Sequence, residues 1–220
     1  MKLPGLREVA FLRSWAAHGR IARIGKPARS EGSVFVREDL AEVADVVAGN
    51  TVPGYKPSKC PPLAHGKVRF VGEAVAMCVA STRALAEDLC AAIALEIEEL
   101  PVLVNAHTAR SDASVRIHDE WPDNSFLTLT CDSNFAHESK GAPVVVTREM
   151  SLARQAMVPL EGKAVLAYWD ARNDQLMLYT STQVPHIIRA GIAQFLGMAQ
   201  GQVRVVSPDV GGGFGYKCVL

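Results

Sequence analysis

Residues 75–98 read VAMCVASTRALAEDLCAAIALEIE and carry the clearest structural pattern in the chain. The continuous apolar run at 75–80 predicts a strand that is buried on both faces. Ser81 is a favourable N-cap, and a helix is expected over 82–92. Alternating apolar and acidic residues at 95–98 then predict a second strand. This strand–helix–strand succession indicates a fold that mixes both kinds of element.

The segments that precede this unit are less regular. Their residue patterns predict strands at 20–24, 33–36 and 67–70, and a helix at 39–47. Four prolines and one glycine between residues 51 and 62 predict an irregular surface loop.

The second half of the chain has its own succession of elements. In chain order, the expected elements are strands at 144–152, 164–169 and 175–180, a helix at 184–196 and a strand at 203–206. A turn is expected at 170–174, Pro185 suits the first turn of the helix, and Gly197 suits its end. A boundary near 125–142 separates two modules that both mix helices and strands, so the expected fold class is α+β.

Length and charge limit the functional classes. The chain has 220 residues, enough for one large or two small domains. It carries 23 basic and 23 acidic residues, so it shows no electrostatic footprint for nucleic acid or an anionic membrane, and association with partners is favoured. The apolar runs are far shorter than the ~20 residues that span a bilayer, and Arg7 and Arg13 interrupt any signal-peptide core. A cytoplasmic location is therefore expected.

The five cysteines do not form a metal-binding pattern. No two have Cys-x-x-Cys spacing, which makes iron–sulfur and zinc sites poor interpretations. They are expected to be buried small residues that stay reduced, with Cys218 a partial exception because of its neighbours: a packing role and a functional role both stay open for it. These residues are Cys60, Cys78, Cys90, Cys131 and Cys218.

The strongest chemical signal is the sequence GGGFG at 211–215. Glycines can take positive φ and let the backbone approach a ligand closely. Successive amide N–H groups in such a loop can bind an anion or a polarised oxygen, with Phe214 as a wall. The spacing fits neither a P-loop nor a Rossmann fingerprint. The alternative is a flexible C-terminal tail.

A second signal is the sequence STQVPH at 181–186, at an expected strand-to-helix junction. Gln183 can donate and accept hydrogen bonds there, beside the free N–H groups of the helix start. The alternative is simple helix capping by Ser181 or Thr182. His186 is interpreted as a surface residue and not as a base.

These two segments, in this order and with VRVV at 203–206 between them, resemble the molybdenum-binding subunit of the xanthine dehydrogenase and aldehyde oxidase family. The upstream sequence AMVPLEGK at 156–163 resembles the same subunit, and VRFVGEAVA at 68–76 resembles the family's α/β hammerhead domain. Further similar segments begin at Phe11. The resemblance implies a hammerhead-type domain at 1–130 and the first part of a mixed α/β molybdopterin-binding domain at 131–220.

The resemblance also implies an activity. Family members hydroxylate an aldehyde or N-heterocycle with water as the oxygen source, on a molybdenum ion held by the dithiolene of a molybdopterin, with a cytosine dinucleotide form as one alternative. No protein metal ligand is therefore expected. Electrons leave through [2Fe–2S] clusters and often FAD, which are expected on partner subunits.

Carried over by position, Gln183 matches the glutamine that hydrogen-bonds an oxygen ligand of molybdenum. The residues that match the loop beside the metal and pterin are Gly212, Gly213, Phe214 and Gly215. The family's catalytic glutamate lies beyond Leu220, and Lys217 and Cys218 stand where some members have a substrate-binding glutamate.

The chain alone is expected to be inactive, with a second polypeptide supplying the rest of the molybdenum domain. The alternatives are a truncated reading frame, a non-catalytic remnant or assembly module of this fold, and an unrelated anion-binding domain. The substrate is not assigned.

Overall fold

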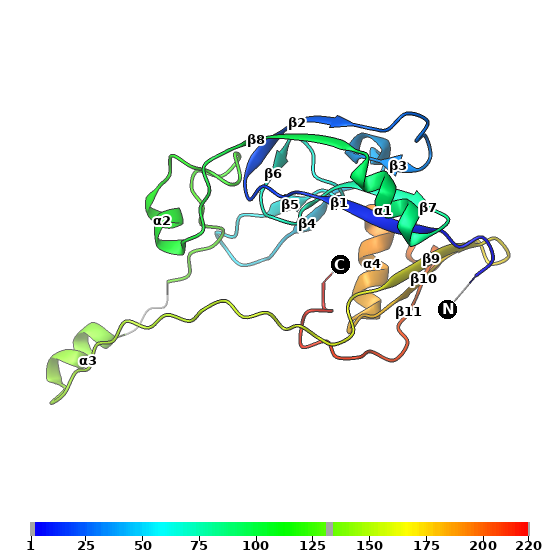
Figure 1. The fold of residues 1–220 in the computed structure, drawn as a ribbon. Coiled ribbons are helices and arrows are strands. Elements are labelled where there is room, and N and C mark those ends of the chain that lie inside the picture. Colours follow the sequence, from blue (N-terminus) through cyan, green and yellow to red (C-terminus); the bar gives the residue numbers. More distant parts are fainter. Residues whose placement is uncertain (1–2, 131–133, 220) are drawn as a thin grey trace. The chain divides into compact units, whose positions relative to one another are not determined.

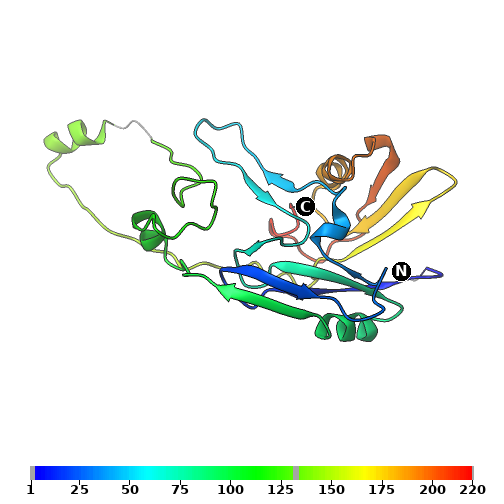
Figure 2. The same ribbon diagram turned by 90° about the horizontal axis from the view of Figure 1, so that it is seen from above.

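The computed structural model describes residues 3–130 and 134–219, and the chain divides into two compact units after Leu127. Figures 1 and 2 show the ribbon from two directions. Each unit mixes helices with strands, so the α+β expectation is confirmed.

The first unit contains two three-stranded antiparallel sheets and a two-stranded ribbon. One sheet has the order β1-β7-β3 and the other the order β6-β2-β8, while β4 pairs with β5. Helix α1 packs against β1 and β7. The elements of this unit are β1 (Glu8–Arg13), β2 (Gly19–Gly25), β3 (Val34–Phe35), η1 (Arg37–Leu40), β4 (Val46–Ala48), β5 (Ser58–Cys60), β6 (Lys67–Val68), β7 (Ala74–Ala80), α1 (Arg83–Ala91), β8 (Ala94–Glu99) and α2 (Ala106–Ser111).

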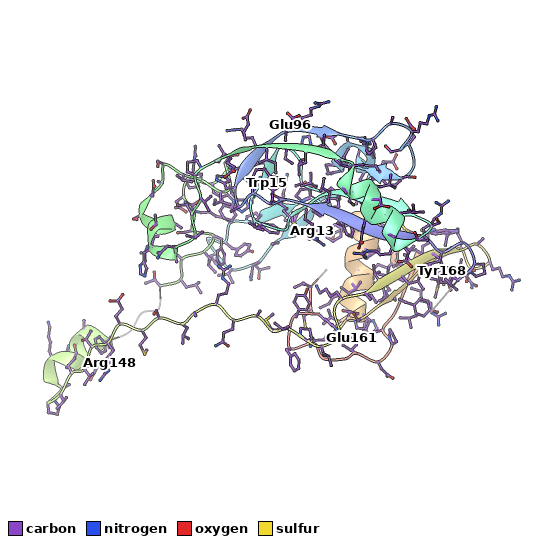
Figure 3. All side chains as sticks on the ribbon, in the orientation of Figure 1. Arg13, Trp15, Glu96, Arg148, Glu161 and Tyr168 are labelled. Carbon is purple, nitrogen blue, oxygen red and sulfur yellow. The ribbon has the colours of Figure 1, made fainter. Side chains whose placement is uncertain are left out.

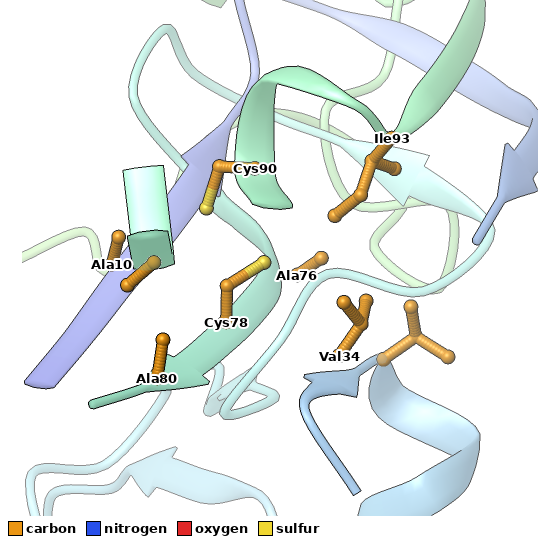
Figure 4. Packing of buried hydrophobic residues seen from close by; sticks show 9 residues of the cluster. Ala10, Val34, Ala76, Cys78, Ala80, Cys90 and Ile93 are labelled. Atoms are coloured by element: carbon orange, nitrogen blue, oxygen red, sulfur yellow. The ribbon is translucent and has the colours of Figure 1, made fainter. Parts of the chain in front are cut away.

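Strand β7 is buried on both faces, as its apolar sequence predicts. Ala76 and Cys78 join one hydrophobic cluster (Figure 4), whereas Val75 joins a second cluster on the opposite face. The small side chain of Ala86 on α1 is fully buried in the first cluster, which lets the helix lie close to the sheet.

Several local predictions for this unit are wrong, each for an identifiable reason. Thr82, not Ser81, is the N-cap of α1, because its side chain accepts the hydrogen bond of Leu85 N–H. The helix expected at 39–47 is only the short η1, which the Asp39 carboxylate closes by accepting from Val36 N–H, and β4 follows. The loop expected at 51–62 contains β5, because the β4 edge offers a pairing partner.

The cysteines divide into two groups. Cys78 and Cys90 are buried, as expected, and burial raises the pKa of the Cys78 thiol to about 12, so it remains a protonated packing residue. Cys60 is exposed, so the prediction of burial is wrong for it, and Cys218, the partial exception, is exposed as well. Cys131 lies outside the described residues.

The second unit contains a three-stranded mixed sheet with the order β11-β10-β9. Strands β9 and β10 form an antiparallel hairpin around the expected turn, and β11 pairs with β10 in parallel. A parallel pair needs a crossover connection, and α4 supplies it, beginning with Pro185 and ending before Gly197 in the left-handed conformation. The elements are α3 (Phe135–Gly141), β9 (Val165–Asp170), β10 (Gln175–Thr180), α4 (Pro185–Phe195), η2 (Gln200–Gln202) and β11 (Val203–Val206).

The strand expected at 144–152 is absent from the described structure. These residues run as an extended trace (Figure 1), and Leu152 is 97% exposed. A strand needs a neighbouring backbone to satisfy its N–H and C=O groups, and no described strand pairs with this segment. Its apolar composition alone therefore does not make it a strand.

Candidate functional site

The candidate site lies where the end of β10 and the start of α4 meet residues 211–215, called the glycine segment here. The backbone carbonyl of Lys217 accepts two hydrogen bonds, from Thr182 Oγ1 at 3.1 Å and from Gln183 N–H at 3.1 Å. Thr182 Oγ1 in turn accepts from Val184 N–H at 3.1 Å. The strand-to-helix junction thus binds backbone that lies 35 positions further along the chain.

Gln183 contacts the glycine segment directly. Its Oε1 accepts a hydrogen bond from Gly215 N–H at 3.1 Å. Within the described part of the chain, its Nε2 donates to no acceptor, so this donor remains available to a ligand. The structure therefore brings together the two segments that the sequence analysis singled out.

The backbone of the glycine segment is folded tightly. Gly212 and Gly215 have φ values of 92° and 83°, and Phe214, with φ of 50°, also lies in the left-handed region. A bulky residue adopts this region at a cost of about 1–3 kcal/mol, and such strain concentrates at functional sites. Phe214 is 71% exposed, and its ring lies against Gly212.

Few backbone N–H groups of the glycine segment lack an acceptor among the described residues, and these few are adjacent. The N–H groups of Gly211, Gly212, Gly215 and Tyr216 are all bonded within the chain. Among the described residues, the N–H groups of Gly213 and Phe214 have no acceptor. Two neighbouring backbone amides therefore remain as donors beside the Gln183 side chain, which lies against Gly213, and amide N–H groups are the kind of donor that an anionic or metal-bound oxygen accepts from.

Neither Ser181 nor Thr182 is the N-cap residue of α4. The N-cap is Val184, without a side-chain cap. Ser181 Oγ instead donates to Gly162 C=O and accepts from Ala164 N–H, and the glycine segment is held at both ends. His186 is exposed, as interpreted from the sequence.

An ion pair beside the site was missed by the sequence analysis. Glu161 lies just before β9 (Figure 3). Its Oε2 atom lies 2.6 Å from Lys217 Nζ and accepts a hydrogen bond from Gly211 N–H at 2.7 Å. The Lys217 ammonium, and next the Gly211 amide, lower the pKa of Glu161. The two charged residues are 56 positions apart, so no local sequence pattern could have paired them.

The site is not an enclosed pocket in this chain. A cavity of about 280 Å³ is lined by residues of β9, β10 and α4, together with Thr182 and Lys217, and not by Gln183 or residues 211–215. This volume falls below the ~300–1,000 Å³ of typical ligand pockets. The described residues hold no group of three or more side chains that could bind a metal ion, and none of their helices is long and apolar enough to cross a membrane.

Comparisons with known proteins agree with this architecture. Residues 1–101 match the aldehyde oxidase and xanthine dehydrogenase a/b hammerhead domain, and residues 117–220 match the molybdopterin cofactor-binding domain. The chain is 34% identical to the nicotine 6-hydroxylase large subunit of Paenarthrobacter nicotinovorans, over 99% of this chain and 27% of that protein. It is 31% identical to the carbon monoxide dehydrogenase large chain of Hydrogenophaga pseudoflava, over 99% of this chain and 29% of that protein.

A solved structure gives the same result. Quinoline 2-oxidoreductase from Pseudomonas putida 86 superposes with a TM-score of 0.91 at 35% identity, over 99% of this chain and 28% of that one. The fold and the matched domains place the chain in the class of proteins that join an a/b hammerhead domain to a molybdopterin cofactor-binding domain. The chain belongs to the xanthine dehydrogenase and aldehyde oxidase family, with similarity to its large subunit. It spans less than a third of the length of these relatives.

Proposed function

We propose that this chain forms part of a molybdenum hydroxylase that hydroxylates an aldehyde or N-heterocycle with water as the oxygen source. The observation that carries the proposal is the meeting of Gln183 with the glycine segment, in a domain that matches the molybdopterin-binding model. Two relatives at 34% and 35% identity are named for nicotine and quinoline, both N-heterocycles, which favours that substrate class.

The proposed roles follow from the donors that remain available. Gln183 Nε2 would donate to an oxygen ligand of the metal, and Gly212, Gly213, Phe214 and Gly215 would lie beside metal and pterin. When bound, the molybdenum cofactor supplies the two-electron acceptor of the reaction. This chain contributes orientation and hydrogen bonds, and the exposed Phe214 ring would form one wall of the substrate slot.

The proposal includes a division of the chain and a set of partners. We assign residues 1–130 to the hammerhead-type domain and residues 131–220 to the first part of the molybdopterin-binding domain. A second polypeptide region would supply the rest of the metal site, since Gln183 and Phe214 are exposed in this chain and need a facing surface to enclose a ligand. An iron–sulfur subunit, and an FAD subunit where the electron acceptor requires one, would complete a cytoplasmic complex. The cytosine dinucleotide form of molybdopterin is the form to test first.

The competing proposal is a non-catalytic remnant or assembly module that keeps the fold and binds no cofactor. The hydroxylase is favoured by the exposure of Gln183 and Phe214 and, among the described residues, by the two backbone amides that have no acceptor. It is also favoured by the strained backbone of Phe214, because a module that binds no cofactor has no use for such strain.

The decisive experiment is co-expression of this chain with the polypeptides encoded beside it. Molybdenum and pterin nucleotide would be measured in the purified complex, and a panel of aldehydes and N-heterocycles would be assayed in ¹⁸O-labelled water. We expect molybdenum, pterin and ¹⁸O-labelled product from the complex, and no turnover from the 220-residue chain alone. A pure complex without molybdenum or pterin would support the remnant instead.

A further inference from the structure

The pair formed by Glu161 and Lys217 is unusual in its burial. The Lys217 side chain is 0% exposed, although lysine is seldom fully buried, whereas the Glu161 side chain is 40% exposed. A buried ammonium is costly unless a partner compensates it, and Glu161 Oε2 is its only hydrogen-bonding partner among the described residues. Such an arrangement needs a physical reason to exist.

The contacts of the pair supply that reason. Glu161 Oε2 binds the N–H of Gly211, and Glu161 N–H donates back to Gly211 C=O at 3.4 Å, which fixes the entry of the glycine segment. The Lys217 carbonyl accepts from Thr182 and Gln183, which fixes its exit. Between these two ends, Gly215 N–H reaches Gln183 Oε1.

We propose that Glu161 and Lys217 are positioning residues that set the orientation of the Gln183 side chain through the glycine segment. Their ion pair closes the segment against the start of α4, so that Gly215 N–H holds Gln183 Oε1 and Nε2 is left to point to a ligand. Neither residue is a donor to that ligand. The effect on turnover rests on the proposed function, whereas the effect on the backbone does not.

The two partners differ in how strongly their substitution should destabilise the protein. Glu161→Gln leaves an ammonium buried without a counter-charge, which destabilises a protein strongly. Lys217→Met keeps an unbranched side chain of similar length and leaves only the half-exposed Glu161 carboxylate, which water can solvate. Lys217→Met is therefore the first variant to test. Arg172→Met, which removes an exposed cation from the β9–β10 turn, is the matched control.

The first experiment measures amide hydrogen exchange by NMR in the full 220-residue chain. In Lys217→Met, exchange at Gly211 and Gly215 should accelerate roughly tenfold or more, because a charge-supported hydrogen bond is lost. Exchange in β9 and β10 should not change, and Arg172→Met should match the wild type everywhere. Unchanged exchange at both glycines would overturn the proposal. If Lys217→Met does not fold, Glu161→Asp, which keeps the counter-charge but withdraws it by one methylene, carries the same test and the same criterion.

The second experiment uses the cofactor-bearing complex and a double-mutant cycle with Gln183→Ala. Lys217→Met should retain the molybdenum content and KM but lower kcat roughly tenfold, and this loss should disappear when Gln183 is already alanine. An equal loss of kcat in both backgrounds would show that Lys217 does not act through Gln183, and would overturn the proposal. A wild-type complex without molybdenum would refute the proposed function, while the exchange measurement would still decide whether the pair positions the loop.

Discussion

A Cβ atom on Gly213 would lie 2.4 Å from Cδ of Gln183. Real Cβ atoms do not approach other atoms so closely, so the Gln183 side chain can occupy its place only because residue 213 has no side chain. The requirement is one of space, since φ of Gly213 lies outside the left-handed region. The glycine segment and the glutamine are therefore shaped for each other.

Gly213→Ala should displace the Gln183 side chain with little loss of stability. The clashing atoms belong to the end of a flexible side chain, so the free energy of unfolding should fall by less than about 1 kcal/mol. Loss of the contact to Gln183 should be visible as faster exchange of the Gly215 amide. Gly201→Ala, with open space around the new Cβ, is the control and should leave this amide unchanged.

Gln183→Ala should leave the fold intact and slow the assembled complex. The side chain is exposed and makes one hydrogen bond, so urea unfolding should show a loss of about 0.5–1.5 kcal/mol. Turnover of the cofactor-bearing complex should fall, because the donor to the metal's oxygen ligand is gone. Wild-type turnover by this variant would refute the role assigned to Gln183.

The stability contributed by Glu161 should depend on pH in a defined direction. Lys217 and the Gly211 amide hold the pKa of Glu161 below its ordinary value of 4.5. A carboxyl group with a lowered folded-state pKa adds stability above its unfolded pKa, and this stability is lost as pH falls through the folded pKa. Between about pH 7 and about pH 3, the wild type should therefore lose more stability than Glu161→Gln.

Urea unfolding of both proteins across this range provides the measurement. Other carboxyl groups with lowered pKa values, such as Asp39, Asp119 and Asp123, are present in both proteins, so the difference isolates Glu161. Parallel pH profiles would contradict the assignment.

Thr82→Ala should destabilise the first unit by about 1 kcal/mol, because Thr82 caps α1. Ser81→Ala, at the neighbouring exposed position, should change the stability by less than about 0.5 kcal/mol. Thermal unfolding of the two variants decides between them, and a larger effect at Ser81 would reverse the cap assignment.

Elements with strong periodicity were predictable from the sequence. Strand β10 has the predicted bounds, β11 likewise, and α4 begins at Pro185 and ends before Gly197. Predictions failed where pairing decides the structure: β5 forms because β4 lies beside it, whereas residues 144–152 have no pairing partner among the described strands. Strand β1 was missed for a related reason, since its pairing with β7 joins residues far apart in the chain.

The candidate site was predictable only in part. The glycine run and the Ser-Thr-Gln sequence marked the two segments, and the structure brings them together through Gly215 and Gln183. The ion pair between Glu161 and Lys217 could not be predicted, because long-range pairing leaves no periodic signal. Only the structure shows which backbone N–H groups lack an acceptor, since those of Gly211 and Gly212 are bonded to acceptors within the chain.

The 56-position separation of Glu161 and Lys217 also has a kinetic meaning. Their contact closes a long loop that contains β9, β10, α4 and β11, and such closure becomes favourable only after the enclosed elements have formed. The glycine segment is therefore expected to order last during refolding and to open first under denaturant. The Gln183 side chain and the backbone N–H groups of the glycine segment would then reach their final positions only after the rest of the second unit has folded.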